Sequence, residues 1–218
     1  MKSASSNIKK PFLRGHFHQA AAFIALGSSA MLVAQSHSTR AVIANLIYGI
    51  SLTGLFTVSA LYHRIQWNQK LRAWMRRLDH SSIFLLIAGT ATPLFALGVP
   101  NETGNRLLMI FWVVAFVGIG QSLLWVNAPK WLAAILYVTA GWLTAPYLGE
   151  MDHFLGRTRV ILLVLGGIIY TAGALVYAFK RPNPFPEIFG YHEIFHTMVI
   201  IAAVLHFVII VGLTGVSS

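Results

Sequence analysis

Residues 192–196 read His-Glu-Ile-Phe-His and match H-E-x-x-H, in which two histidines one helical turn apart bind zinc and the glutamate is a general base. A zinc protease of this kind also needs a third ligand, which in one class is the last histidine of H-E-x-x-H-x-x-G-x-x-H. That extension requires Gly at 199 and His at 202, where this chain has Val199 and Ala202. The match to a protease is therefore incomplete, and we expect the two histidines to serve a different site.

The residues that follow the motif do not supply the missing ligand. Glu193 is the last acidic residue of the chain, and His206 is the only later histidine. His206 follows His196 by ten residues, about 15 Å along a helix, so it lies too deep to share a metal with it. Glu193 lies about 100° around the helix from His192, and at a membrane boundary we expect it to face water or a basic loop.

The composition is that of an integral membrane protein. The chain has 218 residues, of which 56% are hydrophobic and 10% charged, and its mean hydropathy is +0.68. A soluble domain carries about 25% charged residues. The sequence contains no Cys, which excludes disulfides and thiolate metal ligands. The formal charge of +10 is expected to reside in cytoplasmic loops that face anionic lipid, so we expect no nucleic acid partner.

The apolar stretches predict an all-α integral membrane protein, a bundle of seven transmembrane helices. A crossing helix needs about 20 predominantly apolar residues. We expect a single domain over residues 1–218, in which 1–15 form a basic cytoplasmic segment. A cleaved signal peptide is the alternative for the first stretch, but no clean small-x-small cleavage site precedes a soluble domain. The predicted spans are Phe17–Ala34, Ala41–His63, His80–Leu97, Leu107–Val126, Lys130–Leu148, Arg159–Phe179 and Tyr191–Leu213.

Positive charge is distributed unevenly over the predicted loops. Of the 16 Lys and Arg, twelve lie on the side of the amino terminus. The four on the other side are Arg40, Arg106, Arg157 and Arg159. Because loops rich in Lys and Arg stay in the cytoplasm, this bias places the amino terminus inside the cell and the carboxyl terminus outside.

Two further features concern the shape of individual spans. The loop between the second and third spans is typical of a short amphipathic helix lying in the cytoplasmic interface, with an ordinary basic loop as the alternative. Its apolar residues at helical spacing are Trp67, Leu71, Trp74 and Leu78. Pro93 and Pro146 lie inside predicted spans, where neighbouring helices tolerate the kinks that we expect from them.

Polar residues near the span ends meet at one level of the bundle. His63 ends the second span, Asp79 opens the third, and His192 and His196 occupy the first two turns of the seventh. His192 and His196 are four residues apart and share a face, as do Ser59 and His63. Neutral imidazole suits zinc, and three protein ligands plus a water form an open catalytic geometry. We interpret the three histidines as ligands, with Asp79 bonded to a water or to an imidazole N–H.

Three segments resemble a known family. SALYHR at 59–64, LDHSSIFLLIAGTATP at 78–93 and RPNPFPEIFGYHEIFHT at 181–197 resemble the bacterial hemolysin III branch of the progestin and adipoQ receptor superfamily. The likeness runs across all seven predicted spans. It implies a multi-pass protein of the cell membrane, with the bacterial inner membrane as the expected location.

The resemblance also implies a site and a range of functions. The family binds zinc near the cytoplasmic face, which here assigns His63, His192 and His196 as ligands and Asp79 as a contact through water. Related animal receptors are associated with hydrolysis of lipid amides, and bacterial members with cytolysis and membrane-lipid homeostasis. One departure is clear, since FLRGHFHQAAAF keeps His18 but lacks the Glu-x-x-Asn that usually opens the first span. We expect His18 at the interface, with the lining of the cavity as the alternative.

Three functions follow from these residues. The first is a zinc-dependent intramembrane hydrolase of lipid amides or esters, which would bind membrane lipid with its acyl chain inside the bundle. Zinc would activate water and polarise the carbonyl, Asp79 would accept the proton, and Ser59 or Tyr62 would stabilise the oxyanion. The second is a receptor-like or regulatory protein with structural zinc, in which Asp79 is the fourth ligand. The third is a pore-forming cytolysin, although no amphipathic toxin segment is visible.

Overall fold

The computed structural model describes residues 11–125 and 127–214 of the chain. Several residues used for the sequence predictions lie outside the described residues. These are Lys2, Lys9 and Lys10 of the basic amino-terminal segment, Val126 at the predicted end of the fourth span, and the side chain of Lys130.

The described part of the chain is built from helices. Seven elements are long and apolar enough to cross a membrane, with the fifth formed by α5, η1 and α6 together, so the predicted seven-span all-α fold is confirmed. The helices are α1 His16–Ala34, α2 Thr39–Arg64, α3 Gln69–Gly98, α4 Glu102–Leu124, α5 Lys130–Gly141, the 3-10 helix η1 Trp142–Tyr147, α6 Leu148–Leu155, α7 Arg157–Phe179 and α8 Tyr191–Thr214.

Helix α3 begins eleven residues before its predicted start. The side chain of Asn68 accepts a hydrogen bond from the Leu71 N–H at 2.9 Å and caps the helix. Neither Pro nor Gly occurs between Gln69 and Gly89, so nothing interrupts the helix where the polar loop meets the apolar span. The prediction of a separate interfacial helix is therefore wrong, because its residues from Gln69 onwards form the first turns of α3.

The fifth span is interrupted near Pro146. Helix α5 ends at Gly141, six residues adopt the 3-10 conformation, and α6 continues to Leu155, seven residues beyond the predicted end. Pro lacks the N–H that an α-helix would need at this point, which accounts for the tighter turn. Helix α3, in contrast, continues through Pro93 to Gly98.

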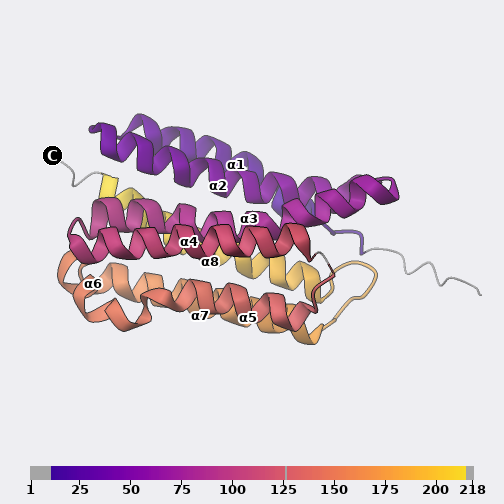
Figure 1. Ribbon diagram of the computed structural model, residues 1–218. Helices are drawn as coiled ribbons and strands as arrows, with labels where there is room; N and C mark the ends of the chain where they lie inside the picture. Colours follow the sequence, from indigo (N-terminus) through magenta and orange to yellow (C-terminus); the bar gives the residue numbers. More distant parts are fainter. Residues whose placement is uncertain (1–10, 126, 215–218) are drawn as a thin grey trace, which may run out of the picture.

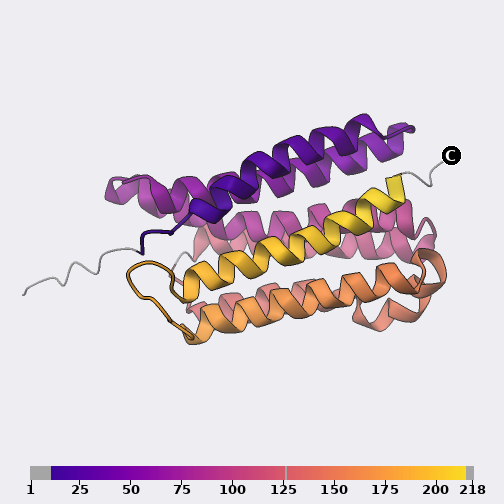
Figure 2. The ribbon, with the colours of Figure 1, turned by 180° about the vertical axis from the view of Figure 1, so that it is seen from behind.

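The helices pack in pairs around α8. Figure 1 shows α1 and α2 side by side, α3 against α4, and α5 beside α7. The reverse view in Figure 2 shows α8 between the α1–α2 pair and α7. Helix α2 packs mainly on α1 and α3, whereas α8 packs mainly on α7.

Small residues allow two of these close contacts. A Cβ on Gly118 would lie 2.4 Å from the ring of Phe84, and a Cβ on Gly166 would lie 2.3 Å from Nε2 of His206. Both glycines therefore permit the close helix contacts that small residues allow in membranes. Gly120, in contrast, faces open space, since no described atom outside its own stretch of helix lies within 4 Å of the position that a Cβ would occupy.

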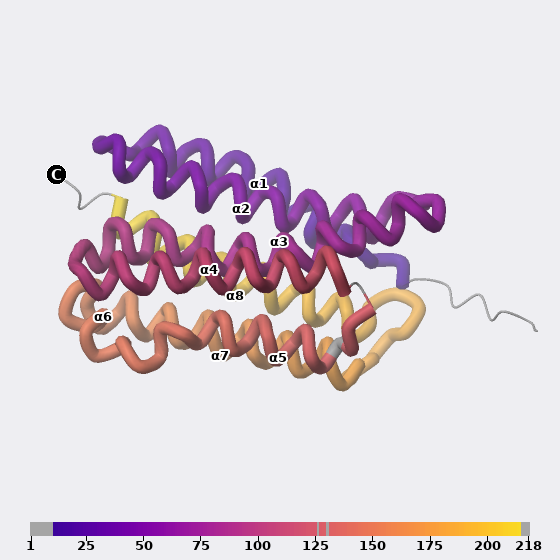
Figure 3. Tube along the Cα trace, in the orientation of Figure 1, coloured from indigo at the N-terminus to yellow at the C-terminus, as the bar shows by residue number. Residues whose placement is uncertain are grey.

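One end of the bundle gathers segments that are distant in sequence. The carboxyl end of α2, the amino end of α3, the α7–α8 connection and the start of α1 lie together there, as the tube in Figure 3 shows. The α1–α2 and α3–α4 turns and α6 lie at the opposite end. The fold thus brings the candidate residues near the span ends to one level.

Candidate metal centre

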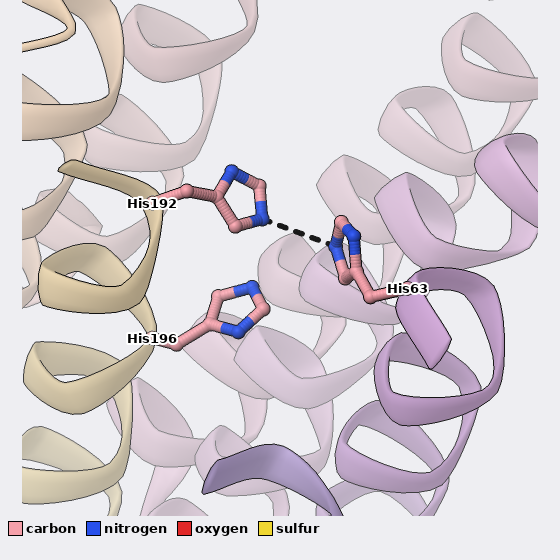
Figure 4. Close-up of side chains that lie close together, drawn as sticks. All are labelled: His63, His192 and His196. Atoms are coloured by element: carbon pink, nitrogen blue, oxygen red, sulfur yellow. Dashed lines mark hydrogen bonds between the residues drawn. The ribbon is translucent and has the colours of Figure 1, made fainter. Parts of the chain in front are cut away.

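The structure brings the three predicted histidine ligands together. His63 lies in the last turn of α2, and His192 and His196 lie in the first two turns of α8 (Figure 4). Nε2 of His63 is 3.1 Å from Nε2 of His192, and one ring nitrogen from each histidine lies within 4.8 Å of the others. The exposed fractions are 8%, 8% and 2%. Three imidazoles from two helices therefore converge in a buried position.

This donor set fits a divalent transition metal. Two nitrogens bound to tetrahedral zinc at 2.0–2.1 Å lie about 3.3 Å apart, and the observed 3.1 Å between His63 and His192 is close to that value. Imidazole suits zinc, copper, iron and nickel, so the ligand type alone does not select one metal. The residues that would hold the ion are His63, His192 and His196.

A carboxylate and a hydroxyl lie beside the histidines. Oδ2 of Asp79, in the third turn of α3, is 3.8 Å from Nε2 of His63, and the side chain of Asp79 is 15% exposed. Ser59 is buried one turn before His63 on α2 and lines the same small cavity as Asp79. The residues assigned from the sequence to proton transfer and to oxyanion stabilisation thus lie beside the three candidate ligands.

His18 lies closer to the histidine triad than its assignment to the interface implies. It is buried in α1, and its ring stacks on that of His196 with centroids 3.7 Å apart and planes 8° from parallel. An imidazole nitrogen binds metal through a lone pair in the ring plane. Two parallel stacked rings therefore present their lone pairs side by side, and His18 supports His196 without binding the same ion.

Substitutions of His18 are expected to separate stacking from ligation. His18→Phe keeps an aromatic ring against His196, so we expect the metal affinity to stay near that of the wild type. His18→Ala removes the ring, and we expect about tenfold weaker binding, as for other residues that orient a ligand. Competition with a chelator of known affinity measures both values. Equal loss in both variants would instead identify His18 as a ligand.

Glu193, the glutamate of the H-E-x-x-H match, is not placed to act as a catalytic base. It is 1% exposed, so it does not face water; of the two expected surroundings, it faces the basic amino-terminal segment. Its Oε1 pairs with Nε of Arg14, and its Oε2 accepts a hydrogen bond from the Gly190 N–H at 2.8 Å. Both carboxylate oxygens are thus engaged in holding the start of α8, which leaves the protease interpretation without its base.

A small cavity with both polar and apolar lining residues adjoins the triad. Its volume is about 50 Å³, enough for a few water molecules at about 10–15 Å³ each. His80 lines it, whereas Tyr62, the alternative to Ser59 for stabilising the oxyanion, does not. Tyr137 and Tyr177 also line it and had no sequence signal, because single tyrosines in apolar helices are common. The other polar residues that line it are His18, Ser59, Asp79, His192 and His196.

A larger apolar cavity of about 140 Å³ lies beside the small one. The two cavities share lining residues on α2, α3, α5, α7 and α8, which are Leu55, Ile83, Tyr137, Ala174, Phe195 and Val199. His206 lines the larger cavity far from the triad, and its Nε2 is 3.3 Å from the carbonyl oxygen of Leu163. This contact joins α8 to α7, and His206 is not part of the triad, as its separation from His196 in the sequence predicts.

Comparison with known proteins gives consistent matches. A family model described as "Haemolysin-III related" matches residues 6–207. Hemolysin-3 of Bacillus cereus is 31% identical over 196 residues, 88% of this chain and 86% of that protein. A Hemolysin-3 homolog of Bacillus subtilis is 33% identical over 154 residues, 71% and 69% of the two chains. The human monocyte to macrophage differentiation factor is 26% identical over 165 residues, 74% and 66% of the chains.

Proposed function

The chain belongs to the Haemolysin-III related family of multi-pass membrane proteins, and we propose that it is a zinc-dependent hydrolase of membrane-lipid amides or esters. The observation that carries this proposal is the buried group of three imidazoles beside a carboxylate, at the mouth of an apolar cavity. In a membrane bundle, ionisable residues are costly to bury and are usually functional. A hydrolytic centre explains why four such residues meet here.

The side chains around the triad suit a hydrolytic reaction. A zinc ion held by His63, His192 and His196 would polarise an acyl carbonyl and make water acidic near neutral pH. Asp79 accepts the proton of the attacking water and returns it to the leaving amine or alcohol. Ser59 lines the same small cavity as Asp79 and would stabilise the negative charge that develops on the carbonyl oxygen.

The two adjoining cavities suit a lipid substrate. The small cavity holds the scissile bond and water, and the larger one takes an acyl chain along walls that are almost entirely apolar. The two cavities are neighbours, since they share lining residues such as Ala174 and Val199. The proposed substrate is therefore a membrane lipid that carries an amide or ester next to a long acyl chain.

The charge distribution supports a reaction on the cytoplasmic side. Eight described Lys and Arg lie at the triad end of the bundle and four at the opposite end. Because basic residues are retained in the cytoplasm, the triad lies near the inner leaflet in this proposal. The eight are Arg14, Arg64, Lys70, Arg72, Arg76, Arg77, Lys180 and Arg181.

A structural role for the metal is the second candidate. The triad joins α2 to α8, and these helices pack mainly on other partners, α2 on α1 and α3 and α8 on α7. An ion bound there would tie two parts of the bundle together. Such a protein would have a receptor-like or regulatory function and would release no lipid product.

Metal analysis of the purified protein, followed by mass spectrometry of lipids incubated with it, tests the hydrolase proposal. We expect about one zinc per wild-type chain and release of fatty acid, and we expect His196→Ala to lose both. His153→Ala, which removes an exposed histidine of α6 at the opposite end, is the matched control. Zinc without lipid products in the wild type would support the structural role, and a wild type without zinc would contradict both.

A further inference from the structure

The residues just before α1 and in its first turn contact His63, His196 and the turn that carries His192. We call residues 12–18 the amino-terminal clamp. The segment crosses the triad end of the bundle before α1 continues along α2 (Figures 2 and 3). Three separate contacts connect it to α2 and α8.

The first contact is the ion pair between Arg14 and Glu193. Arg14 is 18% exposed, and Glu193 is 1% exposed and adjacent to His192 in sequence. The clamp backbone also pairs with the α7–α8 connection, where the Phe12 N–H donates to the Glu187 carbonyl at 2.8 Å. A buried ion pair of this kind is costly to break, because removal of one partner leaves the other charge uncompensated.

The second contact presses the clamp against the last turn of α2. Gly15 has φ of +83°, a conformation that residues with a Cβ rarely adopt. A Cβ at this position would lie 2.9 Å from both Cβ of His63 and Cγ of Arg64. The clamp backbone therefore packs directly against His63, the candidate ligand on α2. Only glycine fits at position 15, because a Cβ there would collide with His63.

The third contact is the stacking of His18 on His196 at 3.7 Å. The clamp thus touches His63 through Gly15, supports His196 through His18, and holds the turn that carries His192 through Arg14. Since α2 and α8 pack mainly on other helices, their separation at this end depends on what bridges them.

We propose that the amino-terminal clamp positions the metal centre, with Arg14 as its principal positioning residue. Through Glu193, Arg14 holds the first turn of α8 at the distance from α2 that three nitrogens around one ion require. Glu193 thus serves the centre as the anchor of the helix that bears two ligands. This inference rests on the proposed metal site but not on the hydrolytic reaction.

Titration of the full chain in detergent with Co²⁺, a zinc substitute whose visible absorption depends on ligand geometry, tests the clamp. We expect Arg14→Met to bind Co²⁺ about 10- to 100-fold more weakly than the wild type, the usual effect of losing a group that orients a ligand, with an altered absorption band. Arg14→Lys, which keeps the charge, is expected to recover most of the affinity. Arg159→Met is the matched control.

The control variant removes an arginine that also forms hydrogen bonds within the bundle. Arg159 donates hydrogen bonds to the carbonyls of Leu155 and Gly212 at 3.0 Å, at the end of the bundle opposite to the triad. Its loss is expected to lower the melting temperature without changing the affinity or the spectrum. If Arg14→Met does not fold, Gly15→Ala takes its place, because it keeps the ion pair and displaces His63; it is expected to weaken binding at least tenfold.

The outcomes separate the clamp from the proposed function. Wild-type affinity and spectrum in Arg14→Met, or in Gly15→Ala where that variant replaces it, would overturn the clamp while the metal site and hydrolase stand. Weakened Co²⁺ binding in Arg14→Met, together with a metal-bound wild type that releases no lipid product, would support the clamp and overturn the hydrolase. A wild type that binds no Co²⁺ would overturn both.

Discussion

Replacement of Asp79 by Asn is expected to lower lipid turnover by about 100- to 10,000-fold, the usual contribution of a general base, while the protein retains its metal. Asn has the shape of Asp, but it cannot accept a proton. The three histidines are unchanged in this variant, and Asp79 is 3.8 Å from the nearest ligand nitrogen. The metal content should therefore stay near one per chain while the release of fatty acid nearly stops.

Glu193→Gln is compared with Asp79→Asn, because the variant with the lower lipid turnover identifies the base. The protease mechanism assigns that role to Glu193, and the proposed hydrolase assigns it to Asp79. In an H-E-x-x-H protease the glutamate is the base, and its loss would be the more damaging change. Here Gln keeps one acceptor oxygen, so it can accept the hydrogen bond from Arg14 or the one from the Gly190 N–H but not both, and we expect turnover per bound metal to fall by at most about tenfold. Fatty acid release by both variants, normalised to bound metal, gives the comparison.

Two results would contradict the role of Asp79. Unchanged turnover in Asp79→Asn would show that another group takes the proton. Loss of metal together with turnover would identify Asp79 as a direct ligand, which favours the four-coordinate structural site.

The convergence of the triad could be predicted from the sequence because it follows from counting helices. Spans of alternating direction bring the end of the second, the start of the third and the start of the seventh to one side. His63, Asp79 and His196 lie at those ends, so their shared level needs no knowledge of side-chain packing. The i, i+4 spacing then places His192 and His196 on one face of α8.

Contacts between distant segments could not be predicted in this way. Arg14 and Glu193 are 179 residues apart, and no periodic pattern links a polar leader to the first turn of a distant helix. The stacking of His18 on His196 depends on the rotation of α1 about its own axis, which an almost uniformly apolar helix does not reveal. The letters of H-E-x-x-H likewise gave no indication that Glu193 is buried in an ion pair.

Helix boundaries show the same limit on a smaller scale. The polar residues before Asp79 marked a loop by composition, whereas the Asn68 cap and an uninterrupted run of helix-forming residues start α3 at Gln69. Composition therefore located the membrane-spanning part of α3, and local hydrogen bonding located its first turn. The exposed Leu71, Trp74 and Leu78 on that extension still give it the amphipathic character that the sequence indicated.

Removal of the metal by a chelator is expected to lower the melting temperature of the wild type by about 5–10 °C and to leave that of His63→Ala unchanged. A ligand at 100 times its dissociation constant stabilises the native state by about 2.7 kcal/mol. For a chain of this length each kcal/mol corresponds to about 2–4 °C. The effect is expected to be large here because the ion joins α2 and α8, which pack mainly on other helices.

The change in melting temperature on chelation distinguishes the two candidate functions when it is combined with the lipid assay. A hydrolase predicts both a lower melting temperature and a loss of fatty acid release on chelation, whereas a structural metal predicts only the first. His153→Ala should behave like the wild type in both assays, since its side chain lies at the far end of the bundle. An unchanged melting temperature in a wild type shown to have lost its metal would mean that the clamp and the helix packing alone hold α2 and α8 together.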